Sequence, residues 1–164
     1  ILAGGGVNIA GANELLEQIL KRLQPIADKQ KVELVLESFR PVTAEVDEVK
    51  ITLAITNLVE NAIKYSFRGY EGAHRLTIEV SKAEEQMHII IANNGRHIEE
   101  DQLKDLNMGK EIKNHFGISN VRKRLKLYYG EDAVIYFENV SPSGVKVHLF
   151  VPLQEEQKDE DSSY

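Results

Sequence analysis

One stretch of the sequence decides the fold: Ile55-Thr-Asn57-Leu-Val-Glu60-Asn61-Ala-Ile-Lys64-Tyr65-Ser66. Together with Ile51 just before it, its apolar residues have the spacing of one side of a long helix, and they are Ile55, Leu58, Val59, Ala62 and Ile63. Asn57, Glu60, Asn61 and Lys64 fall on the other side, within an arc of roughly 100°. Asn is a poor helix former, so two of them one turn apart are unusual on an ordinary solvent-exposed face.

The polar stripe combines groups that suit a magnesium-bound triphosphate. Amide and carboxylate oxygens are ligands for a hard cation, and a Lys can bind phosphate. A purely structural polar face is the alternative, and the stripe by itself leaves both interpretations open. The later segments of the chain favour the first.

Two segments resemble a known family. Asn57-Leu-Val-Glu60-Asn61-Ala-Ile-Lys64-Tyr65-Ser66 resembles the N-box of sensor histidine kinases and of the wider GHKL ATPase superfamily. Phe116-Gly117-Ile118-Ser-Asn120-Val-Arg-Lys-Arg124-Leu resembles their second glycine box and the helix after it. Arg124-Leu-Lys-Leu-Tyr-Tyr-Gly-Glu-Asp is especially similar to kinases of the sugar-sensing and autolysin-regulating classes. The resemblance covers about residues 12–153.

The pattern of elements agrees with the fold that this resemblance implies. Apolar spacing predicts helices over 12–28, 47–66 and 118–128, with a shorter one near 99–106. Alternation predicts strands over 32–37, 76–81, 87–92, 134–138 and 145–151, and 41–44 is a candidate edge partner. We therefore predict an α+β fold, a two-layer α/β sandwich known as the Bergerat fold. Its sheet is mixed and mostly antiparallel, and about three helices cover one face.

Composition sets limits on the function. The 164 residues are 42% apolar, which is enough for one domain with a proper core. Of the net charge of −6, the last eleven residues contribute −4 through five acidic residues and one Lys, so the rest carries only −2. This balance argues against a nucleic-acid partner and against direct contact with an anionic membrane. The absence of Cys excludes a disulfide framework.

Three regions are expected along the chain. Residues 1–11 are predicted to be a flexible N-terminal segment, and because Ile1 is not Met we expect a piece of a longer protein. Residues 12–153 are the predicted histidine-kinase-like ATP-binding catalytic domain. Residues 154–164 are polar and acidic, so we expect a disordered tail.

The resemblance assigns roles to the helical stripe, position by position. It implies that Asn61 coordinates magnesium, that Asn57 and Lys64 face the phosphates of ATP, and that Tyr65 lies near the base and ribose. Glu60 is a candidate for orienting water or metal, and ordinary solvation is its alternative. Packing is the alternative for Tyr65.

Ile91-Ala-Asn93-Asn94-Gly95-Arg96-His97-Ile98 occupies the place of the first glycine box, usually Asp-x-Gly-x-Gly. Here Asn93 replaces the Asp that reads the adenine amino group, and His97 replaces the second Gly. We expect Asn93 to accept from adenine through its carbonyl oxygen, and Gly95 and Ile98 to shape the pocket. Val145 lacks the hydroxyl that members of this family commonly carry at that place. The base pocket therefore has either an altered specificity or a weakened affinity.

The second glycine box is represented by Phe116, Gly117 and Ile118. Gly117 could present backbone N–H groups to phosphate at the start of a helix, and a simple turn is the alternative. The residues from 96 to 115 would then form the lid over ATP, with Gly95 and Gly109 as candidate hinges.

Asn57 also separates branches of the superfamily. Hydrolases of this fold carry a Glu there that activates water, whereas phosphoryl transfer to imidazole needs no activated water. A GHKL kinase that acts on serine is disfavoured for the same reason. The five His residues show no metal-ligand spacing, and none is followed by Glu or Asp in a helical pattern. We therefore expect the phosphoacceptor His to lie on a dimerisation domain outside this chain.

Taken together, the sequence predicts the ATP-binding catalytic domain of a two-component sensor histidine kinase with ATP and Mg²⁺ as cofactors. By resemblance, its partners are the His-bearing dimerisation domain of the same protein and the receiver domain of a response regulator. The resemblance also implies the cytoplasmic portion of a membrane-anchored bacterial sensor. The alternative is a degenerate, non-catalytic module of this fold that signals by protein contacts.

Overall fold

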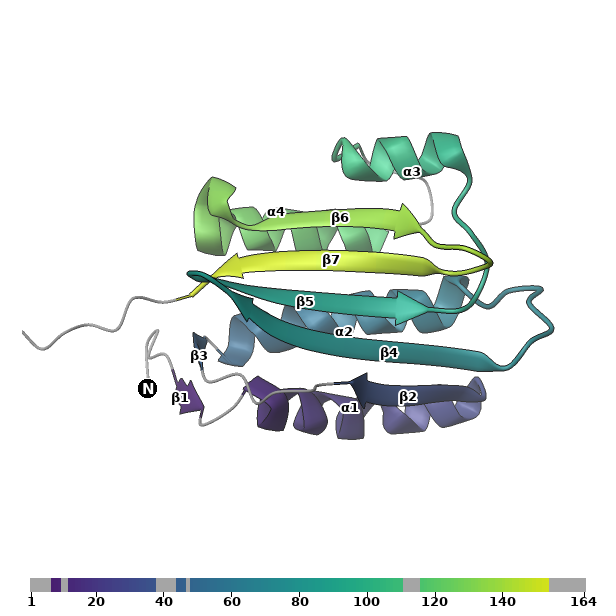
Figure 1. The fold of residues 1–164 in the computed structure, drawn as a ribbon, viewed down its shortest axis with the longest axis horizontal. Coiled ribbons are helices and arrows are strands. Elements are labelled where there is room, and N and C mark those ends of the chain that lie inside the picture. Colours follow the sequence, from purple (N-terminus) through teal and green to yellow (C-terminus); the bar gives the residue numbers. More distant parts are fainter. Residues whose placement is uncertain (1–6, 10–11, 38–43, 47, 111–115, 154–164) are drawn as a thin grey trace, which may run out of the picture.

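The computed structural model describes residues 7–9, 12–37, 44–46, 48–110 and 116–153 (Figure 1). Its helices are α1 (Ala12–Lys29), α2 (Glu48–Tyr65), α3 (Glu100–Asn107) and α4 (Phe116–Tyr129), and a short 3₁₀ helix spans Gly130–Asp132. Its strands are β1 (Val7–Ile9), β2 (Val32–Glu37), β3 (Ala44–Val46), β4 (His74–Ala83), β5 (Gln86–Asn93), β6 (Val134–Asn139) and β7 (Val145–Pro152).

The main sheet has five strands in the order β2-β4-β5-β7-β6. Strand β2 pairs with β4 in parallel, and the other three pairs are antiparallel. Helices α1, α2 and α4 lie together behind this sheet in Figure 1, whereas α3 stands beyond the β6 edge. The predicted two-layer α+β sandwich with a mixed, mostly antiparallel sheet is therefore confirmed.

The core lies between the helices and one face of the sheet. Strand β5 alternates strictly between half-buried and buried positions, so Met87, Ile89, Ile91 and Asn93 all point toward the helices. Val59 and Ile55 of α2 and Leu149 of β7 are fully buried in the same layer. The consequence for the site is that Asn93, the last residue of β5, continues an apolar row and ends it with an amide.

Most predicted elements match the structure within one or two residues, including the hairpin between β4 and β5 and the short helix α3. The N-terminal segment 1–11, predicted to be flexible, contains β1, which pairs with β3. A strand of three residues carries no readable alternation, so the prediction missed it. The predicted edge partner at 41–44 corresponds to β3 only at Ala44. Asp47, a predicted helix cap, and the acidic tail 154–164 lie outside the described residues.

Candidate functional site

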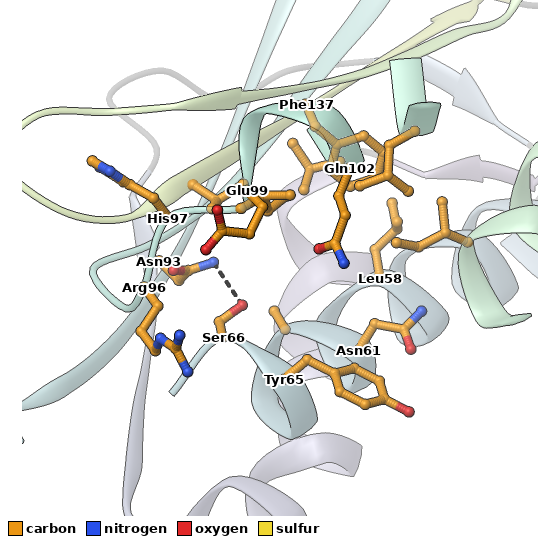
Figure 2. Close-up of a pocket in the computed structure, with 16 residues that line it drawn as sticks. Leu58, Asn61, Tyr65, Ser66, Asn93, Arg96, His97, Glu99, Gln102 and Phe137 are labelled. Carbon is orange, nitrogen blue, oxygen red and sulfur yellow. Dashed lines mark hydrogen bonds between the residues drawn. The ribbon is translucent and has the colours of Figure 1, made fainter. Parts of the chain in front are cut away.

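A cavity of about 240 Å³ opens beside the second half of α2 (Figure 2). Its floor comes from α2, one wall comes from the end of β5 and the loop after it, and another comes from α3, β6 and β7. The described residues that line it are Leu58, Asn61, Ala62, Tyr65, Ser66, Asn93, Arg96, His97, Ile98, Glu99, Gln102, Leu106, Ile118, Phe137, Val145 and Val147. Nine of the sixteen lining residues are apolar or aromatic and seven are polar or charged, so the cavity offers both apolar surface and hydrogen-bonding groups to a small molecule.

Asn61 is the polar residue of α2 that faces this cavity. Its amide nitrogen is buried and has no hydrogen-bond partner among the described residues. A buried N–H group without a partner costs about 1–3 kcal/mol, so native proteins rarely leave one unless a ligand completes it. The Asn61 amide therefore marks a place where a polar ligand group is needed.

Asn93 forms the opposite polar corner. It is only 8% exposed, and its amide makes two hydrogen bonds. Its oxygen accepts from the backbone N–H of Gly95 at 2.9 Å, and its nitrogen donates to the hydroxyl of Ser66 at 3.1 Å (Figure 2). Ser66 follows directly after α2, so the two bonds fix the end of β5 against the end of that helix.

Gly95 is required by close backbone packing and does not line the cavity described here. A Cβ on Gly95 would stand 2.2 Å from the carbonyl oxygen of Ser66. That same oxygen accepts from the backbone N–H of Arg96 at 2.8 Å. Gly144 is similarly constrained, with φ of +114° and a Cβ position 2.1 Å from the carbonyl oxygen of Asn93. Both glycines hold the backbone around Asn93.

Side-chain amides attach α3 to the free edge of β6. Asn107 accepts from the backbone N–H of Phe137 at 2.8 Å and donates to its carbonyl oxygen at 2.9 Å. Asn139 makes the same pair of bonds with Ile98, both at 2.8 Å. The Asn107 amide thus imitates a neighbouring strand on the edge of β6, whereas the Asn139 amide of β6 pairs with the backbone of the loop before α3. These bonds position Ile98 and α3 as a wall of the cavity.

A half-buried Arg connects α3 to α4. Arg122 donates to the carbonyl oxygen of Leu106 at 2.6 Å, in the last turn of α3. A cation at a helix C-terminus is favoured by the helix dipole, and burial lowers the pKa of Arg122. Arg122 thus holds Leu106 in the cavity wall.

The predicted site residues fall into three groups: those that line the cavity, those whose side chains are not described, and those that lie elsewhere. Asn61, Tyr65, Asn93, Ile98 and Ile118 line the cavity together. Phe116 and Gly117 form the first turn of α4, and their side chains lie outside the described part.

Asn57, Glu60 and Lys64 are not among the described residues that line the cavity. The reason is helical geometry: the cavity takes the α2 face of Leu58, Asn61, Ala62 and Tyr65, and the other three lie about 100° around the helix. Asn57 instead lines a narrow depression between α2 and α4, together with Lys50, Arg124 and Tyr128.

Residues 46–155 match the family described as histidine kinase-, DNA gyrase B-, and HSP90-like ATPase. The chain belongs to this ATPase family. Among its relatives are the sensor protein LytS of Enterococcus faecalis, 26% identical over 93% of this chain, and the sensor histidine kinase YpdA of Escherichia coli, 28% identical over 63%. The chain spans about a quarter of the length of the LytS relatives, 27% of the one from Enterococcus faecalis.

Solved structures of histidine kinases share the fold of this ATPase domain. The catalytic domain of histidine kinase ThkA superposes with a TM-score of 0.72 at 22% identity, over 87% of this chain and 93% of that one. ThkA in complex with the response regulator protein TrrA gives the same score at 21% identity, over 90% of this chain and 42% of that one. These neighbours confirm the predicted fold, and the family match confirms the predicted ATPase superfamily.

The sequence analysis missed several lining residues of the ATPase domain, notably Ser66, Glu99 and Gln102. Ser66 stood at the end of the N-box without a role, although its hydroxyl anchors Asn93. Leu58 and Ala62 had been assigned to the core, but with Asn61 and Tyr65 they form one stripe at helical spacing, which the sequence could have revealed. Glu99 and Gln102 had no such signal, because only the docking of α3 brings them to the cavity.

The described residues contain no group of three or more His, Cys, Asp or Glu side chains arranged to hold a metal ion. Within the same ranges, no helix has both the length and the apolar character that crossing a bilayer requires.

Proposed function

We propose that residues 12–153 form the catalytic domain of a sensor histidine kinase that binds magnesium-ATP and transfers its γ-phosphoryl group to a His outside this chain. The observation that carries the proposal is the buried, unpartnered amide of Asn61 at the floor of the cavity. A nucleotide phosphate or ribose oxygen satisfies such a donor, whereas an apolar ligand leaves it unpaired.

The residues present fit a magnesium ion of the kind that accompanies ATP. Mg²⁺ keeps several waters and takes one or two protein oxygens in addition to the phosphates, so it needs no dedicated cage. Asn61, whose amide oxygen is a neutral hard ligand, is the residue that would hold it. When bound, the ion neutralises charge on the phosphates during transfer.

Other residues around the cavity would contact different parts of the nucleotide. Tyr65, Ile98 and Val145, which line the cavity, would enclose the base and ribose, with Asn93 at the polar end of that enclosure. The phosphates would extend from Asn61 toward Asn57 and the first turn of α4, where free backbone N–H groups favour anions. Lys64 is exposed and would reach the phosphates only from the rim of the cavity. Glu60 makes no contact with the described residues that supports a catalytic role.

Asn57 supports transfer to a His over hydrolysis. An Asn cannot take up a proton as the Glu of the hydrolases does, so it does not activate water. A neutral imidazole is already a nucleophile and needs no such base. Catalysis would therefore consist of positioning and charge neutralisation.

The partners follow from the relatives. The chain would act on the His of a dimerisation domain in the same protein, and the phosphoryl group would pass to the receiver domain of a response regulator. The complex of the fold neighbour ThkA with TrrA supports the second partner. The full protein would be a membrane-anchored sensor with this domain in the cytoplasm.

Two measurements test the proposal. Calorimetric titration of the chain with a non-hydrolysable ATP analogue should give an affinity that depends on magnesium. The chain should also phosphorylate an added dimerisation domain from a LytS-type kinase. Asn61→Asp should impair both, whereas Asn120→Asp, an exposed Asn on α4, should impair neither. Unchanged binding and transfer in Asn61→Asp would refute the site.

A non-catalytic signalling module is the second candidate. The placement of Asn57 in the α2–α4 depression and the replacement of the adenine-reading Asp by Asn93 favour it. Magnesium-independent nucleotide affinity together with no transfer to the added domain would support this candidate against the kinase.

A further inference from the structure

The orientation of the Asn93 amide is fixed by a group that can only donate. The backbone N–H of Gly95 lies 2.9 Å from the Asn93 oxygen. Turning the amide over would bring its NH₂ group against that N–H, placing two donors face to face. The Ser66 hydroxyl, which either donates or accepts, adapts to whichever atom it meets and accepts from the nitrogen at 3.1 Å.

The atom on the cavity side is therefore the nitrogen. Ser66, to which the nitrogen is bonded, lines the cavity, whereas Gly95, to which the oxygen is bonded, is not among the described lining residues. Figure 2 shows the Asn93 nitrogen on the Ser66 side and its oxygen turned away. The sequence analysis expected an acceptor here, but the remaining N–H of the amide offers the bound base a donor.

An acceptor lies in the same cavity. Glu99, in the loop just before α3, lines it, and Figure 2 shows its carboxylate on the Asn93 side. A carboxylate only accepts hydrogen bonds when ionised. The polar end of the base enclosure thus combines a fixed donor with an exposed acceptor.

We propose that this donor–acceptor pair makes the base pocket tolerant of 6-oxopurine nucleotides in addition to adenine nucleotides; the proposal rests on the proposed nucleotide-binding function. Adenine has an amino donor at position 6 and an acceptor at N1, and hypoxanthine has an oxygen acceptor at position 6 and a donor at N1. Either edge can pair with one donor and one acceptor. An Asp at position 93 would offer two acceptors and repel the 6-oxo group.

ATP and inosine triphosphate (ITP) form a matched pair for the test, because their bases differ only at position 6 and at the N1 proton. The dissociation constants of both are measured on the 164-residue chain at one magnesium concentration, by competition with a fluorescent ATP analogue. The two constants should agree within about tenfold, the cost of about one mismatched hydrogen bond. A stronger preference for ATP would overturn the proposal while leaving the proposed function intact.

The isosteric variant Asn93→Asp tests the residue itself. At a pH where the carboxylate is ionised, it should shift the ratio of the two constants toward ATP by about tenfold or more. An unchanged ratio would overturn the role of Asn93. His88→Gln, on the far face of the sheet, should leave the ratio unchanged, and a shift there as large as that of Asn93→Asp would also overturn it. If the unaltered chain binds neither nucleotide, the proposed function fails and this inference fails with it.

Discussion

The amide of Asn61 is a side chain at which stability and binding should respond in opposite directions. Asn61→Ala removes a buried unpaired donor, so the free energy of unfolding should stay constant or rise by up to about 1 kcal/mol. The same change should weaken ATP binding at least about tenfold because the phosphate contact is lost. Urea unfolding and calorimetric titration measure the two effects. A variant that loses stability and keeps ATP affinity would contradict this role.

Gly95 should tolerate no side chain. Gly95→Ala places a Cβ against the Ser66 carbonyl, a backbone atom that cannot move without displacing the end of α2. We expect a loss of about 1–3 kcal/mol in the free energy of unfolding and weaker nucleotide binding. Thermal unfolding checks the first. The control is Gly72→Ala, whose added Cβ meets only the flexible ring of Tyr70 and should cost little.

The attachment of α3 to β6 belongs to the next level, the contact between elements. Asn107→Ala removes both hydrogen bonds to Phe137, each worth about 1 kcal/mol. It should therefore lower the free energy of unfolding by about 2 kcal/mol. Amide hydrogen exchange should show lost protection at Phe137. Nucleotide binding should weaken too, because α3 carries Gln102 and Leu106 into the cavity.

The control for this prediction is Lys104→Ala, an exposed position on the same helix. It should change neither the protection of Phe137 nor the free energy of unfolding by more than about 0.5 kcal/mol. If Asn107→Ala behaves like this control, the amide pair does not hold α3 in place.

Across the whole molecule, the open face of the sheet carries a pH-sensitive cluster. His88 Nε2 lies 2.9 Å from Nδ1 of His148, whose Nε2 lies 3.0 Å from the Glu138 carboxylate. The His88 ring also stacks on Phe150, at 4.1 Å between centroids. Burial, and to a lesser degree repulsion from His148, lowers the pKa of His88 below its ordinary 6.5. Only one of the two facing nitrogens can carry a proton.

The pH dependence follows from the sign of that shift. Between the lowered pKa of folded His88 and 6.5, the unfolded chain binds more protons than the folded chain does. The contribution of His88 to the free energy of unfolding should therefore be fully present above pH 6.5. It should decrease as the pH falls below 6.5. Urea unfolding at several pH values around and below that point measures the slope.

His88→Gln is the matched variant, because its amide still donates to His148 but does not titrate. The slope below pH 6.5 should be shallower in this variant than in the unaltered chain. Equal slopes would show that His88 does not contribute to the pH dependence.

Local patterns were sufficient to predict the elements of the fold. The 3.6-residue spacing of α2 and the alternation of β5 are repeated over many residues, so they survive the influence of tertiary contacts. β1 and β3 are the exceptions, since three residues are too few to show a period. Five of the predicted site residues line one cavity. They could be predicted because they lie on long, regular elements or next to a family motif.

The rotation of α2 about its axis and the docking of α3 on the sheet, in contrast, depend on long-range contacts. Asn57 and Asn61 are one turn apart, and only the packing of α2 against the sheet and α4 decides which of them faces the cavity. Glu99 and Gln102 reach it because two amides fasten α3 to the edge of β6. The sequence determined the family and the elements through local periodicity and motif, but the donor that Asn93 offers depends on Gly95 and Ser66. Such an orientation is set by partners distant along the chain, and no local pattern encodes it.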